Sequence, residues 1–465
     1  MAYLGSTPEN QSFTSGTDYF NGNGISVAFT LSRPVASVND IEVVISNVVQ
    51  QPSTAYTVSG TTITFTSAPP AGTSNVYARY MSTATQTITP SPGTVGTSQI
   101  SPSLTNVPFF GGSTIGAGNA TGMKNRLING GMVLDQRNAG ASVTPTDGQY
   151  LVDRWVSTVS QASKLTAQQS SVAPTGFSAS QLITSSSAYS IGSADIFAIS
   201  QKIEGFNFVD MAWGTASAKT VTLSFKVRSS LTGTFGGSFT NAANNRAYPF
   251  LYSISTADTW TSISVTVPGD TTGTWIGATS GIAVRVWLGL GGGSTYSGAA
   301  AGWSTGPYFT ATGATSVVGT SGATFYVTGV QLEEGNAATS FEFRDYGREL
   351  AMCQRYLPAF VEAAINANLP FVGCGVNGTN QTGTYTFEVA TRVPPTGITV
   401  SAASHFSSLR PSSGSTAATA VTFAAASRYA CQFQVSAASG LTADVPYLLF
   451  ANSASAVMLF TGCEL

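Results

Sequence analysis

The sequence has little charge. Of its 465 residues, 9% are Asp, Glu, Lys or Arg, against about 25% in an average soluble protein. The net charge is −2 and no basic run occurs, which excludes the electrostatic surface of a typical nucleic-acid-binding protein. No apolar run reaches the ~18 residues of a membrane span. The first residues lack the basic start and apolar core of a secretory signal, so we expect no classical export.

Side chains that catalyse reactions or bind metals are also scarce. His405 is the only histidine, and the serines next to it, Ser404, Ser407 and Ser408, lie in no Gly-x-Ser-x-Gly motif, so a Ser-His nucleophilic site is not predicted there. Cys353, Cys374, Cys431 and Cys463 lack the spacing of zinc ligands, and synthesis in a reducing cytosol argues against disulfides. We interpret all four as small buried apolar residues. We expect no cofactor; carboxylates could hold a structural Ca²⁺, but no loop motif locates such a site.

Ser, Thr, Gly, Asn and Ala take the place of the missing charge. Aromatic residues make up 11% of the chain and β-branched residues are plentiful, so the composition is not that of a disordered protein. The length allows two to four domains. We predict an all-β protein with hydroxyl-rich surfaces.

The first part of the chain divides at a change in composition. Residues 1–82 contain short β-branched runs separated by Gly, Pro and Asn turns, which is typical of a small β-sandwich. Residues 83–122 contain no charged side chain and are rich in Thr, Ser, Gly and Pro, which indicates a linker. Because apolar residues recur through this segment, we expect an extended shaft.

Residues 123–345 form the largest predicted domain. Strand patterns recur and no helix is predicted, which favours a jelly-roll β-sandwich. Strict alternation in the run 220–228 places four apolar side chains on one face, as a half-buried strand requires. These side chains are Val221, Leu223, Phe225 and Val227.

One helix is predicted, and it follows this domain. Asp345 is a candidate N-cap and Pro358 a stop signal, so the helix is expected over residues 346–358. An apolar stripe on one face consists of Tyr346, Leu350, Cys353 and Leu357. A helix of about three turns is marginal alone, so the stripe must pack against something. That partner is either the neighbouring domain or another copy of the chain, as a contact within a trimer.

Residues 359–465 return to β-patterns and are predicted to form a C-terminal β-sandwich. From residue 363 onward the only charged residues are Glu388, Arg392, Arg410, Arg428, Asp444 and Glu464. Such a segment would dissolve poorly by itself, and association between identical copies would bury the excess apolar surface.

Two stretches about 200 residues apart carry a resemblance to a known family. The first comprises Asn125-Arg-Leu-Ile-Asn-Gly-Gly-Met132 and Tyr150-Leu-Val-Asp-Arg-Trp155, and the second is the run from Val327 to Leu357. Together they resemble a paired motif of bacteriophage tail fibres that carry a jelly-roll similar to carbohydrate-binding modules. Asp18-Tyr-Phe-Asn-Gly-Asn-Gly24 and the strands after it resemble the N-terminal virion-attachment domain of the same fibres, and the C-terminal region resembles their trimeric head.

The resemblance implies a homotrimeric fibre of the virion tail, made in the host cytoplasm. Residues 1–82 would bind a tail or adaptor protein, and the fibre would bind a bacterial surface polysaccharide without cleaving it. A tailspike depolymerase and a capsid-attached head fibre are the alternatives. A free carbohydrate-binding module of a cellular protein is a third, which would normally carry an export signal.

Aromatic side chains are the natural candidates for sugar contacts, because their faces stack on the apolar CH patches of sugar rings. Tyr296, Trp303 and Tyr308 lie in a Gly-, Ser- and Ala-rich stretch and are the better candidates for exposure. Packing between subunits of an oligomer is an alternative to sugar contact for these three residues. Trp260 and Trp287 fall within strand patterns and are predicted to lie in the core.

A depolymerase would instead need two carboxylates flanking a glycosidic bond. Candidate acids are Asp153, Glu204, Asp210, Asp258, Asp270, Glu333 and Glu334. No spacing identifies a pair among them, and no β-helix repeat is visible. We therefore predict no enzyme activity and no catalytic residue.

Overall fold

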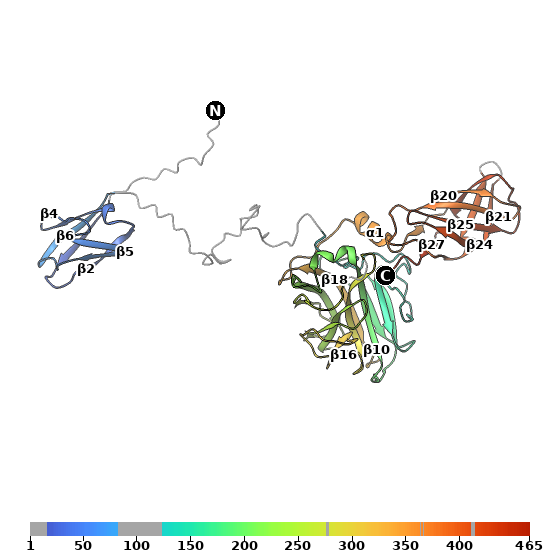
Figure 1. Ribbon diagram of the computed structural model, residues 1–465, viewed down its shortest axis with the longest axis horizontal. Helices are drawn as coiled ribbons and strands as arrows, with labels where there is room; N and C mark the ends of the chain where they lie inside the picture. Colours follow the sequence, from blue (N-terminus) through green and yellow to red (C-terminus); the bar gives the residue numbers. More distant parts are fainter. Residues whose placement is uncertain (1–15, 82–122, 276–278, 363, 366, 411–413) are drawn as a thin grey trace, which may run out of the picture. The chain divides into compact units, whose positions relative to one another are not determined.

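The structure is a computed structural model (Figure 1) that describes all residues except 1–15, 82–122, 276–278, 363, 366 and 411–413. The chain divides into two compact units, Met1–Val107 and Pro108–Leu465. Nearly all regular structure consists of strands, so the prediction of an all-β chain is confirmed. The predicted shaft, residues 83–122, lies outside the described residues.

The first unit is a small β-sandwich. A sheet in the order β1-β6-β3-β4 faces the two-stranded antiparallel sheet β2-β5 across a core that contains Tyr56, Ile63 and Val76. Strand β1 pairs with β6 at the edge of this sheet. The strands are β1 Thr17–Gly22, β2 Ala28–Val35, β3 Ile41–Ile45, β4 Val48–Val49, β5 Tyr56–Phe65 and β6 Gly72–Tyr80.

The second unit begins with the predicted jelly-roll, built from two five-stranded antiparallel sheets. Sheet I has the order β13-β12-β15-β10-β7 and sheet II the order β14-β11-β18-β9-β8. The strands are β7 Trp155–Val159, β8 Leu165–Ser170, β9 Ser180–Ser185, β10 Ile196–Glu204, β11 Val221–Ser229, β12 Gly233–Asn241, β13 Ala247–Ile254, β14 Thr261–Val267, β15 Ile282–Gly292 and β18 Thr324–Glu334.

Alternation along β11 determines which face of sheet II is buried. Val221, Leu223, Phe225 and Val227 all point into the core between the sheets, as the sequence predicts. The side chains between them, including Ser224 and Lys226, lie on the outer face. This outer face of sheet II is where the groove described below is found.

The outer face of sheet I is covered by its own chain. The segment 293–311, with the short strands β16 (Ser297–Gly298) and β17 (Thr310–Ala311), folds back over β12 and β15. Trp287 points outward from β15 and lies under this segment, stacked on Phe309 at 4.3 Å between ring centroids. Trp287 is therefore buried as predicted, but beneath a loop and not between the sheets. The prediction that Trp260 lies in a core strand is corrected. This residue precedes β14 and is only partly buried, with its ring edge-on to Tyr326.

Helix α1 (Tyr346–Gln354) follows the jelly-roll and begins as predicted. The Asp345 side chain accepts a hydrogen bond from Arg348 N at 2.9 Å and so caps the first turn. The helix ends four residues before Pro358, because Arg355 and Tyr356 turn toward a buried acid of β10. Glu204 accepts hydrogen bonds from Arg355 at 2.6 and 3.0 Å and from the Tyr356 hydroxyl at 2.6 Å.

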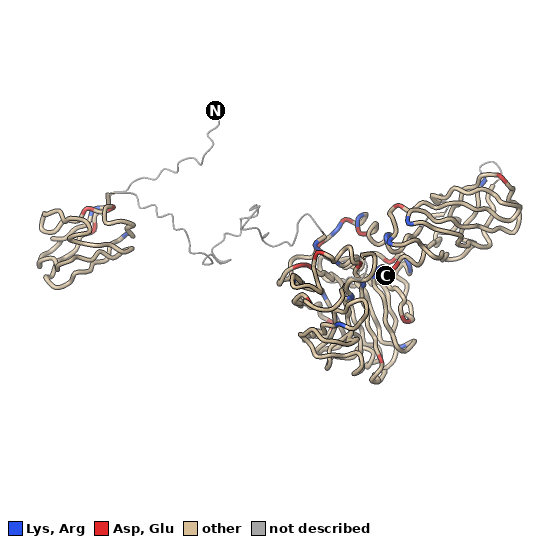
Figure 2. Tube along the Cα trace, in the orientation of Figure 1, with Lys and Arg blue, Asp and Glu red and all other residues tan. Residues whose placement is uncertain are grey.

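The C-terminal strands stay within the predicted all-β class but close into a six-stranded barrel in the order β20-β21-β25-β24-β23-β26. A three-stranded sheet, β19-β27-β22, extends it. Figure 2 shows how few charged residues the barrel carries. The strands are β19 Ala359–Glu362, β20 Ala367–Gly375, β21 Asn380–Thr386, β22 Gly397–Val400, β23 Phe406–Arg410, β24 Gly414–Ala426, β25 Ala430–Ala437, β26 Pro446–Ala451 and β27 Ala456–Thr461.

One of the four cysteines departs from its predicted burial. Cys353, Cys431 and Cys463 are buried free thiols, whereas Cys374 is exposed. The cause is strand alternation, since Leu369 and Phe371 of β20 point into the barrel and leave Cys374 on the outside. Within the described residues, no helix is long and apolar enough to span a membrane, and no cluster of three His, Cys, Asp or Glu side chains is arranged to bind a metal ion.

Candidate functional site

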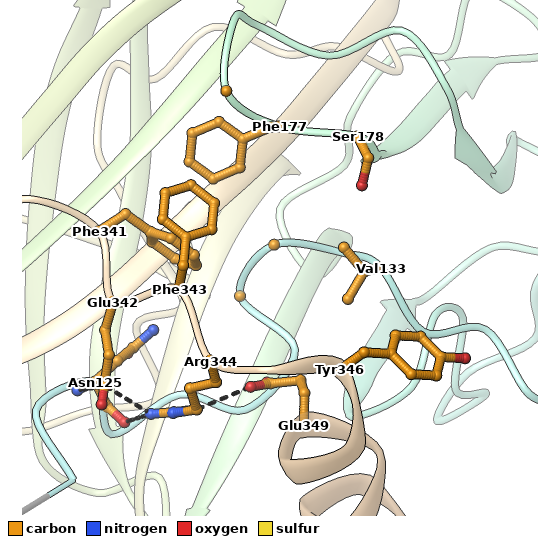
Figure 3. A pocket seen from close by; sticks show the side chains of 13 residues that line it. Asn125, Val133, Phe177, Ser178, Phe341, Glu342, Phe343, Arg344, Tyr346 and Glu349 are labelled. Atoms are coloured by element: carbon orange, nitrogen blue, oxygen red, sulfur yellow. Dashed lines mark hydrogen bonds and ion pairs between the residues drawn. The ribbon is translucent and has the colours of Figure 1, made fainter.

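Three phenylalanines form a ridge on the outer face of sheet II (Figure 3). Phe177 comes from the loop between β8 and β9, and Phe341 and Phe343 from the segment that joins β18 to helix α1. The ring centroids lie 5.2 Å apart for Phe177 with either partner and 4.9 Å apart for Phe341 with Phe343. Phe343 is 65% exposed. We call these three residues the phenylalanine ridge.

A β-bulge seats the ridge on the sheet. The register between β11 and β18 shifts next to Gly329, whose φ of +63° lies in the left-handed region. A Cβ atom at this position would stand 2.8 Å from the Phe177 ring. Gly329 is thus required both for its backbone conformation and for the close approach of Phe177.

The ridge separates two hollows, which together we call the groove. The first hollow has a volume of about 630 Å³ and lies between the ridge, Val133 and Tyr346, with mostly apolar atoms in its walls. Tyr346 is 63% exposed and presents its ring at the edge of this hollow (Figure 3). The first hollow therefore offers aromatic surface from two sides.

The second hollow, of about 420 Å³, lies on the sheet itself and shares Phe177, Phe341 and Phe343 with the first. Its floor carries the outward hydroxyls of β11 and β14 together with one amine. Lys226 Nζ donates a hydrogen bond to Ser262 Oγ at 2.9 Å. The other polar residues around it are Thr175, Ser224, Ser264, Thr339 and Ser340.

An ion network holds the floor of the first hollow. The Arg344 side chain is 2% exposed and pairs with Glu342 at 3.0 Å and with Glu349 at 3.4 Å. It also donates hydrogen bonds to the carbonyl oxygens of Asn125 and Leu127. Both carboxylates are engaged a second time, by the backbone N–H groups of Asn125 and Asn129. The segment that carries Phe341 and Phe343 is fixed by these bonds.

The same contacts join the two halves of the paired sequence motif. Asn125 Nδ2 donates to Val330 O at 3.0 Å, and its Oδ1 accepts from Leu332 N at 3.0 Å. Gly130 passes so close to β18 that a Cβ atom there would lie 2.1 Å from Val330 O. Asn125 and Gly130 of the first stretch are therefore needed where the chain enters the domain beside the strand that closes it.

The three aromatic residues named as candidates for sugar contact are each partly buried against the protein, and their contact with sugar stays a prediction. Trp303 lies edge-on to Trp213, Trp275 and Tyr248, at 5.0 to 5.1 Å between centroids, and donates its Nε1–H to Pro268 O at 2.8 Å. Tyr296 stacks on Phe309 at 5.3 Å.

Tyr308 is likewise half-buried and not freely exposed. Its ring fills the space beside Gly298 and Gly306, where a Cβ atom would lie 2.6 and 2.8 Å from it. The expectation that Tyr296, Trp303 and Tyr308 are exposed is thus corrected for all three rings.

The apolar stripe of the helix packs largely within the chain. Leu350 and Cys353 contact Ile128 and Leu134, and Leu357 lies beyond the helix against Ala359 and Leu459. Tyr346, the first residue of the stripe, faces the groove. That the helix contacts another copy stays a prediction.

All seven candidate carboxylates have partners. Glu204, Asp210, Asp258, Asp270 and Glu334 form ion pairs with Arg355, Arg126, Arg228, Arg246 and Lys219. Glu333 accepts hydrogen bonds from Thr339 and Gln331. Asp153 accepts two from Gln136, and burial raises the pKa of this carboxyl group to about 6. No two of these acids are brought together around either hollow of the groove.

The last residues of the chain lie against the outer side of sheet I. Lys202 Nζ and the Tyr150 hydroxyl both donate to Leu465 O at 2.6 Å, and Glu464 pairs with Arg137 at 2.6 Å. Burial raises the pKa of the Glu464 carboxyl group to about 7 in spite of the arginine, and lowers the pKa of Lys202 to about 8. This end of sheet I is therefore closed as well.

No protein-family model and no curated protein sequence matches the chain. Among solved structures, one match is the enzymatically active domain of tailspike protein 4 of bacteriophage CBA120, at 11% identity and a TM-score of 0.23, over 45% of this chain and 21% of that one. A putative sugar-binding protein from Bacteroides thetaiotaomicron matches at 12% identity and a TM-score of 0.27, over 46% of this chain and all of that one. A family 11 carbohydrate-binding module of Clostridium thermocellum matches at 11% identity and a TM-score of 0.22, over 43% and 98%. What this chain binds therefore has to be argued from its own groove.

Proposed function

We propose that the chain is a non-catalytic, glycan-binding adhesion protein and that the groove on sheet II is its binding site. The observation that carries the proposal is the phenylalanine ridge, an exposed aromatic cluster with a hollow on each side. Sugar rings stack on aromatic faces, while hydroxyl groups read their substituents. The ridge and the serines of the second hollow provide both kinds of contact side by side.

The proposed binding needs no catalysis. The acids in the walls of the groove are Glu342 and Glu349, and both are engaged by Arg344 and by backbone N–H groups. A glycosidase needs one carboxyl group to donate a proton and another to attack or activate water. Two acids tied to one buried arginine form a structural support and not an acid–base pair, which favours binding over hydrolysis.

The setting that we propose is a homotrimeric fibre of a phage virion tail, on the resemblance of the two motif stretches and of residues 1–82 to such fibres. The first unit would attach to a tail or adaptor protein. Several grooves per fibre would bind a repeating surface polysaccharide together, so that weak single contacts add up to firm adsorption. The low charge of the barrel suits association between copies of the chain.

The test of glycan binding is a screen of the full chain against bacterial surface polysaccharides by affinity electrophoresis, followed by Phe343→Ala. We expect this substitution to weaken binding about tenfold, because one stacking ring is removed. Phe206→Ala is the matched control, since Phe206 is 58% exposed on the same domain but lies outside the groove. Equal binding by both variants would refute the proposed site.

The rival functions require other measurements. Release of reducing ends from the bound polysaccharide would show a depolymerase and overturn the non-catalytic proposal. Immunogold labelling of virions distinguishes tail from head attachment, and the mass of the purified chain in solution tests the trimer. A mass of one chain would contradict the fibre arrangement.

A further inference from the structure

A third hollow continues the groove away from sheet II. It has a volume of about 420 Å³ and lies between the loop after Leu134, one side of helix α1 and strand β19. It shares Val133 and Tyr346 with the first hollow and no residue with the second, which meets the first hollow at the phenylalanine ridge. Figure 3 shows the ridge and Tyr346 on opposite sides of the first hollow. The three hollows therefore lie in a row, with the first in the middle.

An exposed aromatic side chain stands at each passage from one hollow to the next. Phe343 of the ridge is 65% exposed and lies between the second and first hollows. Tyr346 is 63% exposed and lies between the first and third. Because sugar rings stack on aromatic faces, a glycan chain that follows the row would meet a stacking surface at both passages.

The third hollow has the polar character that sugar hydroxyl groups require. Its walls are mostly polar atoms, in contrast to those of the first hollow. The Gln354 amide, at the end of helix α1, lines it and makes no hydrogen bond within the described part of the chain. The Asp135 carboxylate is already engaged, by the backbone N–H groups of Asn138 and Gly140 at 3.0 and 2.8 Å. A free amide both donates and accepts hydrogen bonds, as a hydroxyl-rich ligand needs.

Both ends of the row reach exposed residues. The second hollow extends from the ridge, which lies over Gly329 of β18, across β11 to the edge strand β14, where Ser262 and Ser264 are exposed. The third hollow reaches β19, where Val361 is 47% exposed. A polymer longer than the row can therefore continue past either end.

We propose that the three hollows together bind an extended stretch of a polysaccharide chain, with at least one sugar residue in each hollow, a ligand class that rests on the glycan binding proposed above. Strand β19 of the C-terminal region takes part in this site beside the jelly-roll and helix α1. A site for a single terminal sugar would need only one of the hollows.

The test is calorimetric titration of the full chain with fragments of increasing length. The probes are fragments of one to about eight sugar units, made by partial acid hydrolysis of the polysaccharide that binds in the screen. We expect binding to tighten about tenfold or more between one unit and about four, as one hollow after another is filled, and then to level off. A dye coupled to the reducing end of the longest fragment should leave its binding unchanged, because the chain continues beyond the site.

Substitutions then locate the third hollow. Gln354→Ala should weaken binding of the long fragments about three- to tenfold, the range of one lost hydrogen bond. It should leave binding of two-unit fragments unchanged, because these fit the other two hollows. Val361→Trp, which places a larger side chain at the wall of the third hollow, should have the same dependence on length. Gln432→Ala is the matched control, since Gln432 is exposed on β25 and lines none of the three hollows.

The outcomes separate this ligand class from the proposed function. Equal binding of the shortest and longest fragments, or loss of binding with the dye, would show a site for a terminal sugar. Either result would overturn the extended chain and leave glycan binding intact. Long fragments that bind Gln354→Ala and Val361→Trp as tightly as the unchanged chain would exclude the third hollow and overturn it too. If no polysaccharide in the screen binds, both proposals fail.

Discussion

The two outer faces of the jelly-roll differ, because sheet I is covered by its own chain and sheet II is left open around the groove. Sheet I carries the larger aromatic side chain, Trp287, but the segment 293–311 covers it and the last residues of the chain close the other end. Around the groove, sheet II carries small hydroxyl side chains and Lys226 and stays open, and the aromatic surface there comes from loops beside the sheet. The comparison shows that exposure is decided by what folds over a face and not by the residues of the face itself.

The largest expected effect is on stability, when the ion network of Arg344 beneath the first hollow is removed. Arg344→Ala should lower the free energy of unfolding by about 3–5 kcal/mol, because it leaves two largely buried carboxylates without their partner. Arg348→Ala, on the exposed side of helix α1, should change the free energy of unfolding by less than about 0.5 kcal/mol. Urea unfolding measures both. A small effect of Arg344→Ala would mean that the floor of the first hollow does not depend on the network.

The second prediction contrasts an aromatic residue that stabilises the fold, Trp303, with one that is proposed to bind glycan, Phe343. Trp303→Ala should cost about 3 kcal/mol of stability, because this ring of the covering segment packs among three other aromatic rings. Phe343→Ala should leave the unfolding midpoint nearly unchanged and weaken glycan binding. Thermal unfolding and affinity electrophoresis on both variants test this. A stable Trp303→Ala protein that binds no glycan would restore the sequence-based site.

A third, smaller effect concerns the bulge under the ridge. Gly329→Ala should destabilise the protein by about 1–2 kcal/mol through its left-handed conformation and also displace Phe177. Gly322→Ala controls for the first effect, since its φ is +74° and nothing lies near its missing Cβ. Only Gly329→Ala should weaken glycan binding. If both variants bind equally, the position of Phe177 does not matter.

The last prediction concerns the covered face, sheet I, and the pH dependence of its stability. Burial raises the pKa of Glu464 from 4.5 to about 7, so between these values the folded protein holds more protons than the unfolded chain. This group's contribution to stability is therefore complete at low pH and is lost as the pH rises toward 7, with a slope of at most about 1.4 kcal/mol per pH unit. Glu464→Gln should flatten the dependence measured by urea unfolding between pH 5 and pH 8. An unchanged slope would assign it to other groups.

The sequence predicted the fold where local chemistry is decisive. Alternation placed Val221, Leu223, Phe225 and Val227 in the core, and Asp345 marked the start of the helix. The end of the helix was not predictable, since Glu204, which draws Arg355 and Tyr356 away, lies about 150 residues earlier in the chain. Closure of the C-terminal barrel likewise depends on pairings between distant strands.

Only part of the candidate site could be predicted from the sequence. The sequence singled out the stretch that contains Phe341 and Phe343, but gave no sign that Phe177 joins them, because that contact requires the bulge at Gly329. Elsewhere, the glycine content of the sequence led to a wrong expectation about exposure. The glycine-rich sequence around Tyr308 predicts an exposed ring, whereas Gly298 and Gly306 let the chain pack closely against that ring. Glycine content alone does not distinguish these cases.

The pairing of Asn125 with β18 has a consequence for how such chains are assembled. The segment that enters the jelly-roll and the segment that leaves it run together, with Lys124 bonded to Ser340 and Asn125 bonded to Glu342. A domain whose entrance and exit coincide can be spliced into a host chain at a single point without disturbing what lies on either side. The groove, which is built at this same junction, would be carried along with the transplanted domain, and exchange of this one cassette would give a recipient a new specificity.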